Sequence, residues 1–287
     1  METEATSGTA IDARPADPPP AVGALLAAAC VTALVASVWA GLTLRRRIRE
    51  GRPVVAPRPH AAVPWSGVDV AVVFATYCAG MGLAGSLLPQ KPPLADTLFA
   101  GLVVSLAATL VGAAWLGCRG ATLATLGFAG RRWREDFALA CAGLALVLAP
   151  VLALAGLLDR LLPYRHPIVD YLRGQQDAQA IGLVVLSAVL TAPLTEEFFF
   201  RRVLQGWLER IVPAGDPAPV VVSALAFGLA HHEHGLAWVP LTLLGIVLGV
   251  IAQRTGSIVP CIILHALFNA VSVILLLVQM ALGPAAG

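Results

Sequence analysis

The sequence predicts an all-α, polytopic integral membrane protein with about eight transmembrane helices. Of its 287 residues, 58% are hydrophobic and only 13% are charged, whereas soluble domains carry about 25% charged residues. The mean hydropathy is +0.81. Apolar runs follow one another without a long polar block between them, which favours one membrane domain over two soluble ones. The net charge of +2 gives no indication of nucleic-acid binding.

The first half of the chain predicts a tail followed by four membrane helices. Residues 1–20 are polar and rich in Pro, so we expect a disordered tail. Four apolar runs are then long enough to cross a hydrocarbon core of about 30 Å: residues 21–44, 65–88, 96–118 and 137–158. Residues 159–179 mix apolar and charged side chains, which predicts an amphipathic segment along the membrane surface. Residues 21–179 would thus form an accessory membrane region.

The second half, residues 180–287, predicts four more spans and a catalytic region. Its apolar runs cover residues 180–210, 217–231, 236–253 and 257–282. Gly245 and Gly249 form a Gly-x-x-x-Gly pattern in the third of these runs, and small residues at this spacing let two helices approach closely. Together with the first half, these runs bring the predicted number of membrane helices to about eight.

Arginine clusters predict the orientation. One lies between residues 45 and 58, after the first apolar run, and another between residues 119 and 134. The positive-inside rule places both loops in the cytoplasm, and positive charge after the first run argues against a cleaved signal peptide. Lys91 is the only lysine, which is typical of a GC-rich bacterial genome and favours a bacterial inner membrane. The five cysteines include no CxxC pair, so neither a disulfide framework nor a cysteine zinc site is indicated.

Two adjacent carboxylates and two guanidinium groups follow an apolar run, in the stretch from Thr195 to Arg202. An ionisable side chain in a membrane segment costs about 2.5 to 3.5 kcal/mol on insertion scales, and it therefore indicates function. Glu197 and Arg201 are four residues apart on one helical face and can neutralise each other. Glu196 points about 100° away and lacks that partner, which suits a general acid or base.

Two further pairs at helical spacing lie downstream. Phe227 and His231 are four residues apart at the end of an apolar run. His265 and Asn269 have the same spacing within another apolar run. Because an imidazole and a carboxamide can both donate hydrogen bonds to one developing negative oxygen, this last pair has the geometry of an oxyanion hole.

These three motifs, in this order, resemble those of the CAAX protease and bacteriocin-processing (CPBP) family of intramembrane glutamic proteases, of the Ras-converting-enzyme type. The motifs are Glu196-Glu197-x-x-x-Arg201, Phe227-x-x-x-His231 and His265-x-x-x-Asn269. The resemblance covers roughly residues 180–282. It implies an endopeptidase in which Glu196 with His231 activates the nucleophilic water, while His265 with Asn269 stabilises the tetrahedral oxyanion.

The resemblance also implies supporting residues and partners. Glu197 and Arg201 would position the site and balance its charge, with Phe227 beside them. The substrate would be a membrane-associated protein or peptide in the lipid bilayer, cleaved near a lipidated cysteine. The predicted orientation of the spans, rather than the resemblance, places Glu196 and His265 toward the cytoplasmic side. No cofactor is implied. The sequence does not indicate the oligomeric state.

Other readings of the same residues stay open. If His232 and Glu233 began the zinc protease motif His-Glu-x-x-His, its second histidine would lie at position 236, which is Leu236. A zinc site made by His231, His265 and Glu196 nevertheless has a suitable ligand set. A scaffold or immunity protein of the same family would keep the cluster without catalysis. A transporter could use it as a proton relay, although no inverted repeat favours that reading.

Overall fold

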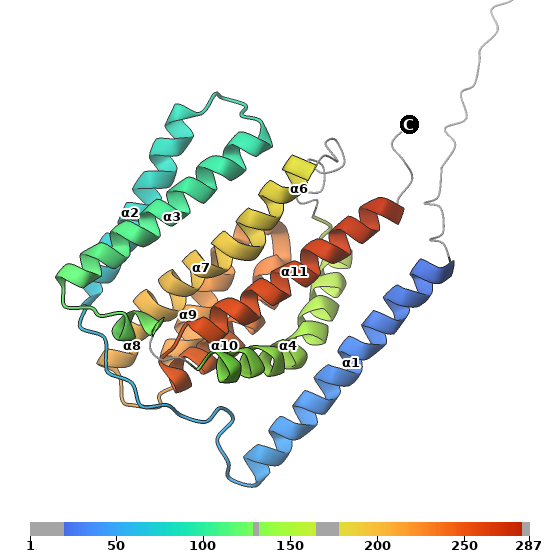
Figure 1. Ribbon diagram of the computed structural model, residues 1–287, viewed down its shortest axis with the longest axis horizontal. Coiled ribbons are helices and arrows are strands. Elements are labelled where there is room, and N and C mark those ends of the chain that lie inside the picture. Colours follow the sequence, from blue (N-terminus) through green and yellow to red (C-terminus); the bar gives the residue numbers. More distant parts are fainter. Residues whose placement is uncertain (1–19, 129–131, 165–177, 283–287) are drawn as a thin grey trace, which may run out of the picture.

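The computed structural model describes residues 20–128, 132–164 and 178–282 and consists, over these residues, of helices connected by turns and loops (Figure 1). The predicted fold class is confirmed. Within the described ranges, seven helical segments are long and apolar enough to cross a membrane. The long single helices are α1 (Pro20–Arg49), α2 (Gly67–Leu87), α3 (Leu94–Cys118), α4 (Trp133–Leu161), α10 (Trp238–Thr255) and α11 (Val259–Leu282).

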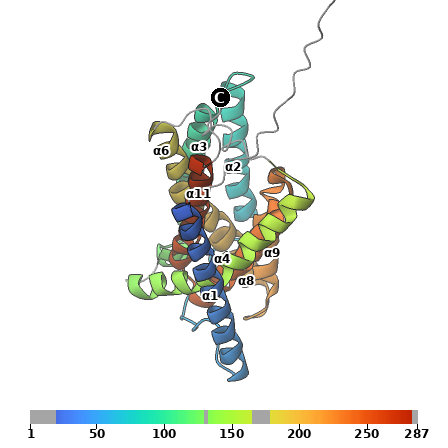
Figure 2. The ribbon, with the colours of Figure 1, turned by 90° about the vertical axis from the view of Figure 1, so that its right-hand side faces the viewer.

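The four spans predicted in the first half correspond to α1, α2, α3 and α4. The first of these lies at the periphery and packs along α4 (Figures 1 and 2), where the Ser37 hydroxyl donates to the carbonyl of Ala145 at 2.6 Å. Its helix continues past the predicted end at residue 44 to Arg49, because arginines in a last turn interact favourably with the helix dipole.

Two predicted segments of the first half fall mostly outside the described residues. The disordered tail predicted for residues 1–20 is one of them, but its last residue, Pro20, begins α1, as suits a residue without an N–H at a helix start. The amphipathic segment predicted for residues 159–179 is the other. Here α4 continues to Leu161, and residues 165–177 are not described.

The predicted span over residues 180–210 is one helical segment from Ala178 to Ile211, which we call the central segment, and it contains wider π-helical turns. It is made of α6 (Ala178–Val185), the π-helix η2 (Leu186–Thr191), α7 (Ala192–Glu196), the π-helix η3 (Glu197–Leu204) and α8 (Gln205–Ile211). In η3 the carbonyl of Phe200 accepts from the backbone N–H of Gln205, five residues ahead, and from the Ser223 hydroxyl at 2.8 Å. Such π-turns often mark functional sites.

The span predicted for residues 217–231 is wrong as a complete crossing. Its helix, α9 (Ala218–Leu229), has 12 residues and is therefore about 18 Å long, too short for a core of about 30 Å. It ends in a turn that leads to the 3₁₀ helix η4 (His232–Ala237) and then to α10.

The predicted close approach of helices at Gly245 and Gly249 is confirmed. A Cβ atom at Gly245 would lie 3.1 Å from the Cα atom of Ala224, and one at Gly249 would lie 2.9 Å from Val220. Because α9 packs this tightly against α10, its C-terminal end has a defined position within the bundle.

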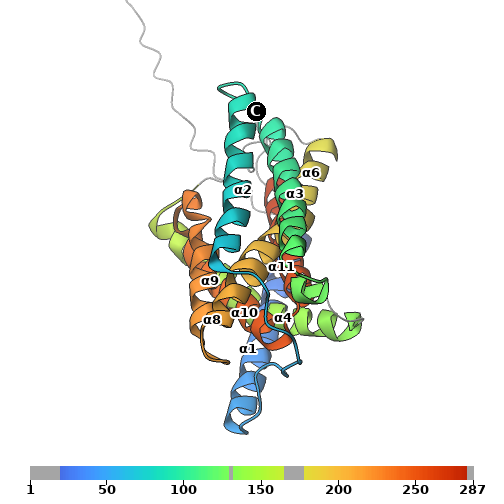
Figure 3. The same ribbon diagram turned by 90° about the vertical axis from the view of Figure 1, so that its left-hand side faces the viewer.

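Two larger apolar cores lie within the described bundle. One joins α2 and α3 to η3 and includes the fully buried Trp65, whose indole N–H donates to the carbonyl of Val203 at 3.1 Å. The other joins α4, α10 and α11 around residues such as Leu248 and Leu264. Figure 3 shows α2 and α3 side by side along one flank of the bundle.

Candidate active site

Three helical elements bring a carboxylate and two imidazoles together in the membrane bundle. Glu196 ends α7, His231 follows α9, and His265 lies in α11. The Nε2 atom of His231 is 3.9 Å from Oε1 of Glu196, and the Nε2 atom of His265 is 3.8 Å from Oε2 of the same carboxylate. Residues that are 35 and 69 positions apart in the sequence thus converge on Glu196.

Glu197, the residue after Glu196, is completely buried. Its Oε2 atom is 3.4 Å from Nε of Arg201, also within a buried side chain, so the pairing predicted from their spacing is confirmed. Its Oε1 atom is 2.8 Å from Nδ1 of His265. The second contact joins two helices, so it is not part of the local helical pattern and could not be predicted from residue spacing.

Backbone contacts define the tautomer of His231. Its Nδ1 atom is 2.9 Å from the carbonyl oxygen of Phe227, one helical turn earlier. A carbonyl oxygen can only accept a hydrogen bond, so Nδ1 is the donor. In a neutral ring, Nε2 is then unprotonated, and this is the nitrogen that faces Glu196.

Phe227 is fully buried and contacts three of the polar residues. Its ring centroid lies 5.2 Å from that of His231 and 5.5 Å from that of His265, both in edge-on geometry. The guanidinium carbon of Arg201 lies 4.6 Å from the Phe227 ring centroid, in a cation–π arrangement. Phe227 therefore separates the buried Arg201 from the two imidazoles and restrains both rings.

Asn269 lies one turn after His265 on α11, and its hydrogen-bond partner is a backbone carbonyl rather than a residue of the Glu196 cluster. Its amide nitrogen donates to the carbonyl of Ala188 at 2.8 Å. Ala188 belongs to the π-helix η2. The contact ties α11 to the central segment and uses one of the two amide hydrogens of Asn269.

An apolar cavity reaches Glu196 and His231. It has a volume of about 610 Å³ and lies between the α2–α3 pair and the central segment with α9. Phe74, Leu98 and Phe199 are among its apolar lining residues. Glu196 and His231 expose 25% and 21% of their side chains, so the cavity has a polar end. The predicted accessory helices α2 and α3 thus form one wall of the site.

The lining of this cavity includes polar residues that the sequence analysis did not single out. Tyr77 on α2 and Ser105 on α3 lie in its wall, as does Thr195 of the central segment. In the sequence, these residues are recognisable only as single polar residues within apolar runs. Because many such residues only bond to their own helix, as the Thr195 hydroxyl does to the carbonyl of Thr191 at 2.9 Å, the sequence alone could not separate them.

Possible metal ligation was tested on geometry. In the part of the chain that the structure describes, no three His, Cys, Asp or Glu side chains are arranged as a group that could hold a metal ion. The approach of His231 and His265 to Glu196, at 3.9 and 3.8 Å, is wider than the spacing of about 3.3 Å that ligands 2.0 to 2.1 Å from a tetrahedral zinc ion would have.

The fold and the site define a class: a polytopic α-helical membrane protein with a carboxylate–histidine cluster at the polar end of an apolar cavity. Residues 178–271, about a third of the chain, match the model of the type II CAAX prenyl endopeptidase Rce1-like family. The family that the three motifs predicted is confirmed for this region, and it gives an intramembrane endopeptidase of the CAAX type as the general function. No curated protein and no solved structure matches the chain.

Proposed function

We propose that this protein is a glutamic-type intramembrane endopeptidase in which Glu196 and His231 activate the attacking water. One observation carries the proposal: Glu196 and His231 line the same apolar cavity with their facing atoms 3.9 Å apart. This separation is too long for a direct hydrogen bond and short enough for one bridging water. Oε2 of Glu196 is buried and has no hydrogen-bond partner among the described residues.

The chemical steps follow from the donors and acceptors of this cluster. Water bound between Glu196 and Nε2 of His231 loses a proton to Glu196, while its oxygen forms a bond to the carbonyl carbon of the scissile peptide. The carbonyl electron pair moves to the oxygen, which becomes the oxyanion. When the tetrahedral intermediate collapses, the C–N bond breaks and the leaving nitrogen takes the proton from Glu196. The products are a carboxylic acid and an amine.

His265 is placed to donate to the oxyanion from Nε2. A ring that donates from Nδ1 to Glu197 and from Nε2 to a substrate oxygen carries both protons and is a cation. With Arg201 also positive, the two cations balance the two carboxylates Glu196 and Glu197. This charge balance lowers the cost of keeping the cluster within the membrane. The remaining amide hydrogen of Asn269 is proposed as a second donor.

The cavity supports a membrane-associated substrate. Its lining is mainly apolar and includes the aromatic residues Phe74, Phe199 and Phe200. A volume of about 610 Å³ is within the range of about 300 to 1,000 Å³ that is usual for ligand sites. We propose that the apolar part receives the lipid or apolar side chains of the substrate and that cleavage occurs near a lipidated cysteine. A site built from these side chains requires no metal.

We further propose that the arginine-rich end of the bundle faces the cytoplasm of a bacterial cell, across its inner membrane. Contacts bring the loops that contain these arginines to one end: the N–H of Arg58 donates to the carbonyl of Arg254 at 2.8 Å, and Arg119 pairs with Asp69 at 3.1 Å. Arg210 donates to the carbonyl of Trp65 at the same end. The positive-inside rule then gives the orientation.

Peptide cleavage by the purified protein in detergent tests the proposal. A prenylated C-terminal peptide and a matched unprenylated peptide would be incubated with the protein, and the products mapped by mass spectrometry. We expect the unchanged protein to cleave the peptide and Glu196→Gln to abolish cleavage. The control Glu50→Gln, at an exposed site, should retain cleavage. A chelator should not change the activity. Loss of activity with chelator would indicate the zinc alternative, and full activity of Glu196→Gln would contradict the mechanism. Absence of cleavage across a peptide library would favour a scaffold.

A further inference from the structure

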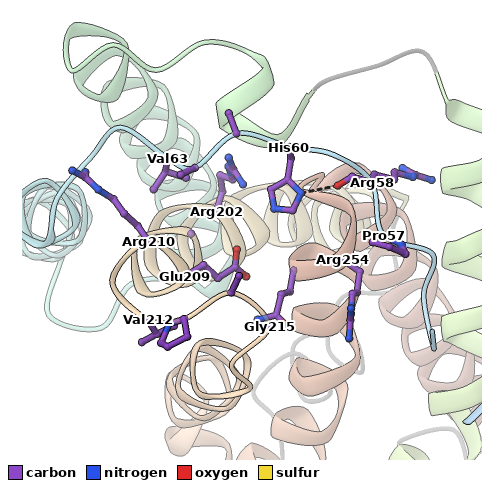
Figure 4. Close-up of a pocket in the computed structure, with 16 residues that line it drawn as sticks. Pro57, Arg58, His60, Val63, Arg202, Glu209, Arg210, Val212, Gly215 and Arg254 are labelled. Atoms are coloured by element: carbon purple, nitrogen blue, oxygen red, sulfur yellow. Dashed lines mark hydrogen bonds between the residues drawn. The ribbon is translucent and has the colours of Figure 1, made fainter. Parts of the chain in front are cut away.

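A second cavity lies at the arginine-rich end of the bundle and shares no lining residue with the active-site cavity. It has a volume of about 320 Å³. Its walls come from the linker between α1 and α2, from η3 and α8, and from the end of α10 (Figure 4). The ionisable residues that line it are Arg58, His60, Arg202, Glu209, Arg210 and Arg254.

The lining of this cavity contains more arginines than carboxylates that could neutralise them. Arg58 pairs with Asp136 at 2.5 Å and with Glu135 at 3.5 Å. Arg202, Arg210 and Arg254 have no ion pair among the described residues, and Glu209 is the only acidic residue in the lining. The carboxylate of Glu209 accepts a hydrogen bond from Gln205 at 2.8 Å.

Helix-end stabilisation accounts for only part of this excess. Arg210 and Arg254 lie in the last turns of α8 and α10, where a cation interacts favourably with the helix dipole whether or not a ligand binds. Arg202 lies inside the continuous helical segment, where no such effect operates. Its position in the wall of the cavity needs a different explanation.

Arg202 is buried and incompletely bonded. It is 4% exposed, and its Nε atom donates to the carbonyl of Thr125. Its Nη2 atom has no hydrogen-bond partner among the described residues. The guanidinium carbon lies 5.7 Å from the ring of Trp65, and Figure 4 shows the side chain between Val63 and His60. A buried cation with unused donors is costly unless a ligand or another partner compensates it.

We propose that this cavity binds a phosphate group, with Arg202, Arg210 and Arg254 as its cationic donors. Guanidinium groups match the oxygens of a phosphate in geometry and charge. The cavity lies where the membrane-spanning segments that contain α8 and α10 end, and helices that cross a bilayer end near its lipid headgroups. Basic pockets at the ends of membrane helices bind such headgroups. The phosphate comes from an anionic phospholipid headgroup or from soluble phosphate.

Binding at this site is separate from peptide hydrolysis, and its test does not depend on activity. Arg202 adjoins Arg201 in η3, so occupancy would stabilise the segment that holds the Glu197–Arg201 pair. A ligand that binds only the folded protein raises its thermal stability. A rise in melting temperature on ligand addition is therefore expected beside direct binding.

Binding would be measured on the purified full chain in detergent by native mass spectrometry and by thermal shift. The probes are short-chain phosphatidylglycerol, phosphatidylcholine of the same chain length, and inorganic phosphate. We expect phosphatidylglycerol to bind more tightly than phosphatidylcholine. Arg254→Gln should raise its Kd about fivefold, the effect of one basic residue near a charged lipid surface. The control Arg49→Gln, an exposed arginine at the end of α1 outside the cavity, should leave Kd unchanged.

The pattern across the probes identifies the source of the phosphate. If inorganic phosphate binds and Arg254→Gln weakens this binding, the ligand is soluble phosphate. If phosphatidylglycerol binds and inorganic phosphate does not, the ligand is a lipid headgroup. Arg254 is exposed, so its substitution does not threaten the fold. The proposal is overturned if neither phosphatidylglycerol nor inorganic phosphate binds, or if Arg254→Gln and Arg210→Gln bind phosphatidylglycerol as the original protein does.

Discussion

The Nδ1 atom of His265 lies 2.8 Å from Oε1 of Glu197, so a buried hydrogen bond joins two residues 68 positions apart. Oε2 of the same carboxylate lies 3.4 Å from Nε of Arg201. Glu197 thus has two cationic or potentially cationic partners on different helices. It connects the local charge pair of the central segment to the imidazole that faces Glu196.

The first prediction concerns this connection. Glu197→Gln keeps the volume of the side chain and removes its charge, so a doubly protonated His265 loses its counter-charge. We expect kcat to fall about 10²-fold, the effect of losing one oxyanion donor, while KM stays unchanged. Steady-state kinetics with the cleaved peptide would measure both, with Glu50→Gln as the control. Unchanged kcat in a folded Glu197→Gln protein would contradict the role.

The second prediction compares two neighbouring histidines. His231 faces Glu196, whereas the exposed His232 has its Nδ1 atom 3.0 Å from the carbonyl of Leu229. His231→Ala should reduce kcat at least 10²-fold because the water loses one of its two partners. His232→Ala should retain activity. If both variants lost kcat equally, the loss would come from damage to the turn after α9 and not from impaired water activation.

The third prediction tests the apolar cavity as the substrate site. Gly101 on α3 lines the cavity, and a Cβ atom there would meet nothing within 4 Å. Gly101→Leu should therefore fill part of the cavity without a backbone clash and lower kcat/KM about tenfold, because one or two side-chain carbons of apolar contact are worth about 1 to 3 kcal/mol.

Gly82 on α2 provides the matched control for this substitution. It also has nothing within 4 Å of a Cβ atom, and it lies outside the cavity lining. Gly82→Leu should retain kcat/KM, and both variants should keep the melting temperature of the original protein. If Gly101→Leu is as active as Gly82→Leu on the same peptide, the substrate does not use this part of the cavity.

The fourth prediction concerns the packing that positions His231. A Cβ atom at Gly228 would lie 2.6 Å from the carbonyl oxygen of Trp238 and would also overlap the hydroxyl of Thr242. Gly228→Ala should push α9 away from α10 and destabilise the protein by about 1 to 3 kcal/mol, with loss of activity. Gly41→Ala, at a position with open space around it, is the control. Unfolding in increasing denaturant would measure the difference.

Part of the candidate site could be predicted because helical spacing is a local property. Glu197 and Arg201, and likewise Phe227 and His231, are one turn apart, so their contacts follow once the segment is helical. The convergence of Glu196, His231 and His265 was expected only through the resemblance to a family. The π-helical segments η2 and η3 could not be predicted, because a π-turn differs from an α-turn by a single residue in its hydrogen-bonding pattern and leaves the helical spacing of the side chains nearly unchanged.

The sequence by itself determined the membrane-embedded all-α fold and the three residue pairs, since both depend on composition and on spacing within single helices. Tertiary structure decided which pairs meet. The contact of His265 with Glu197, the contact of Asn269 with Ala188 and the cavity wall from α2 and α3 all join segments far apart in the chain. Their register depends on close packing at positions such as Gly228 and Gly245, and this packing is specified by the shapes of two facing helices together.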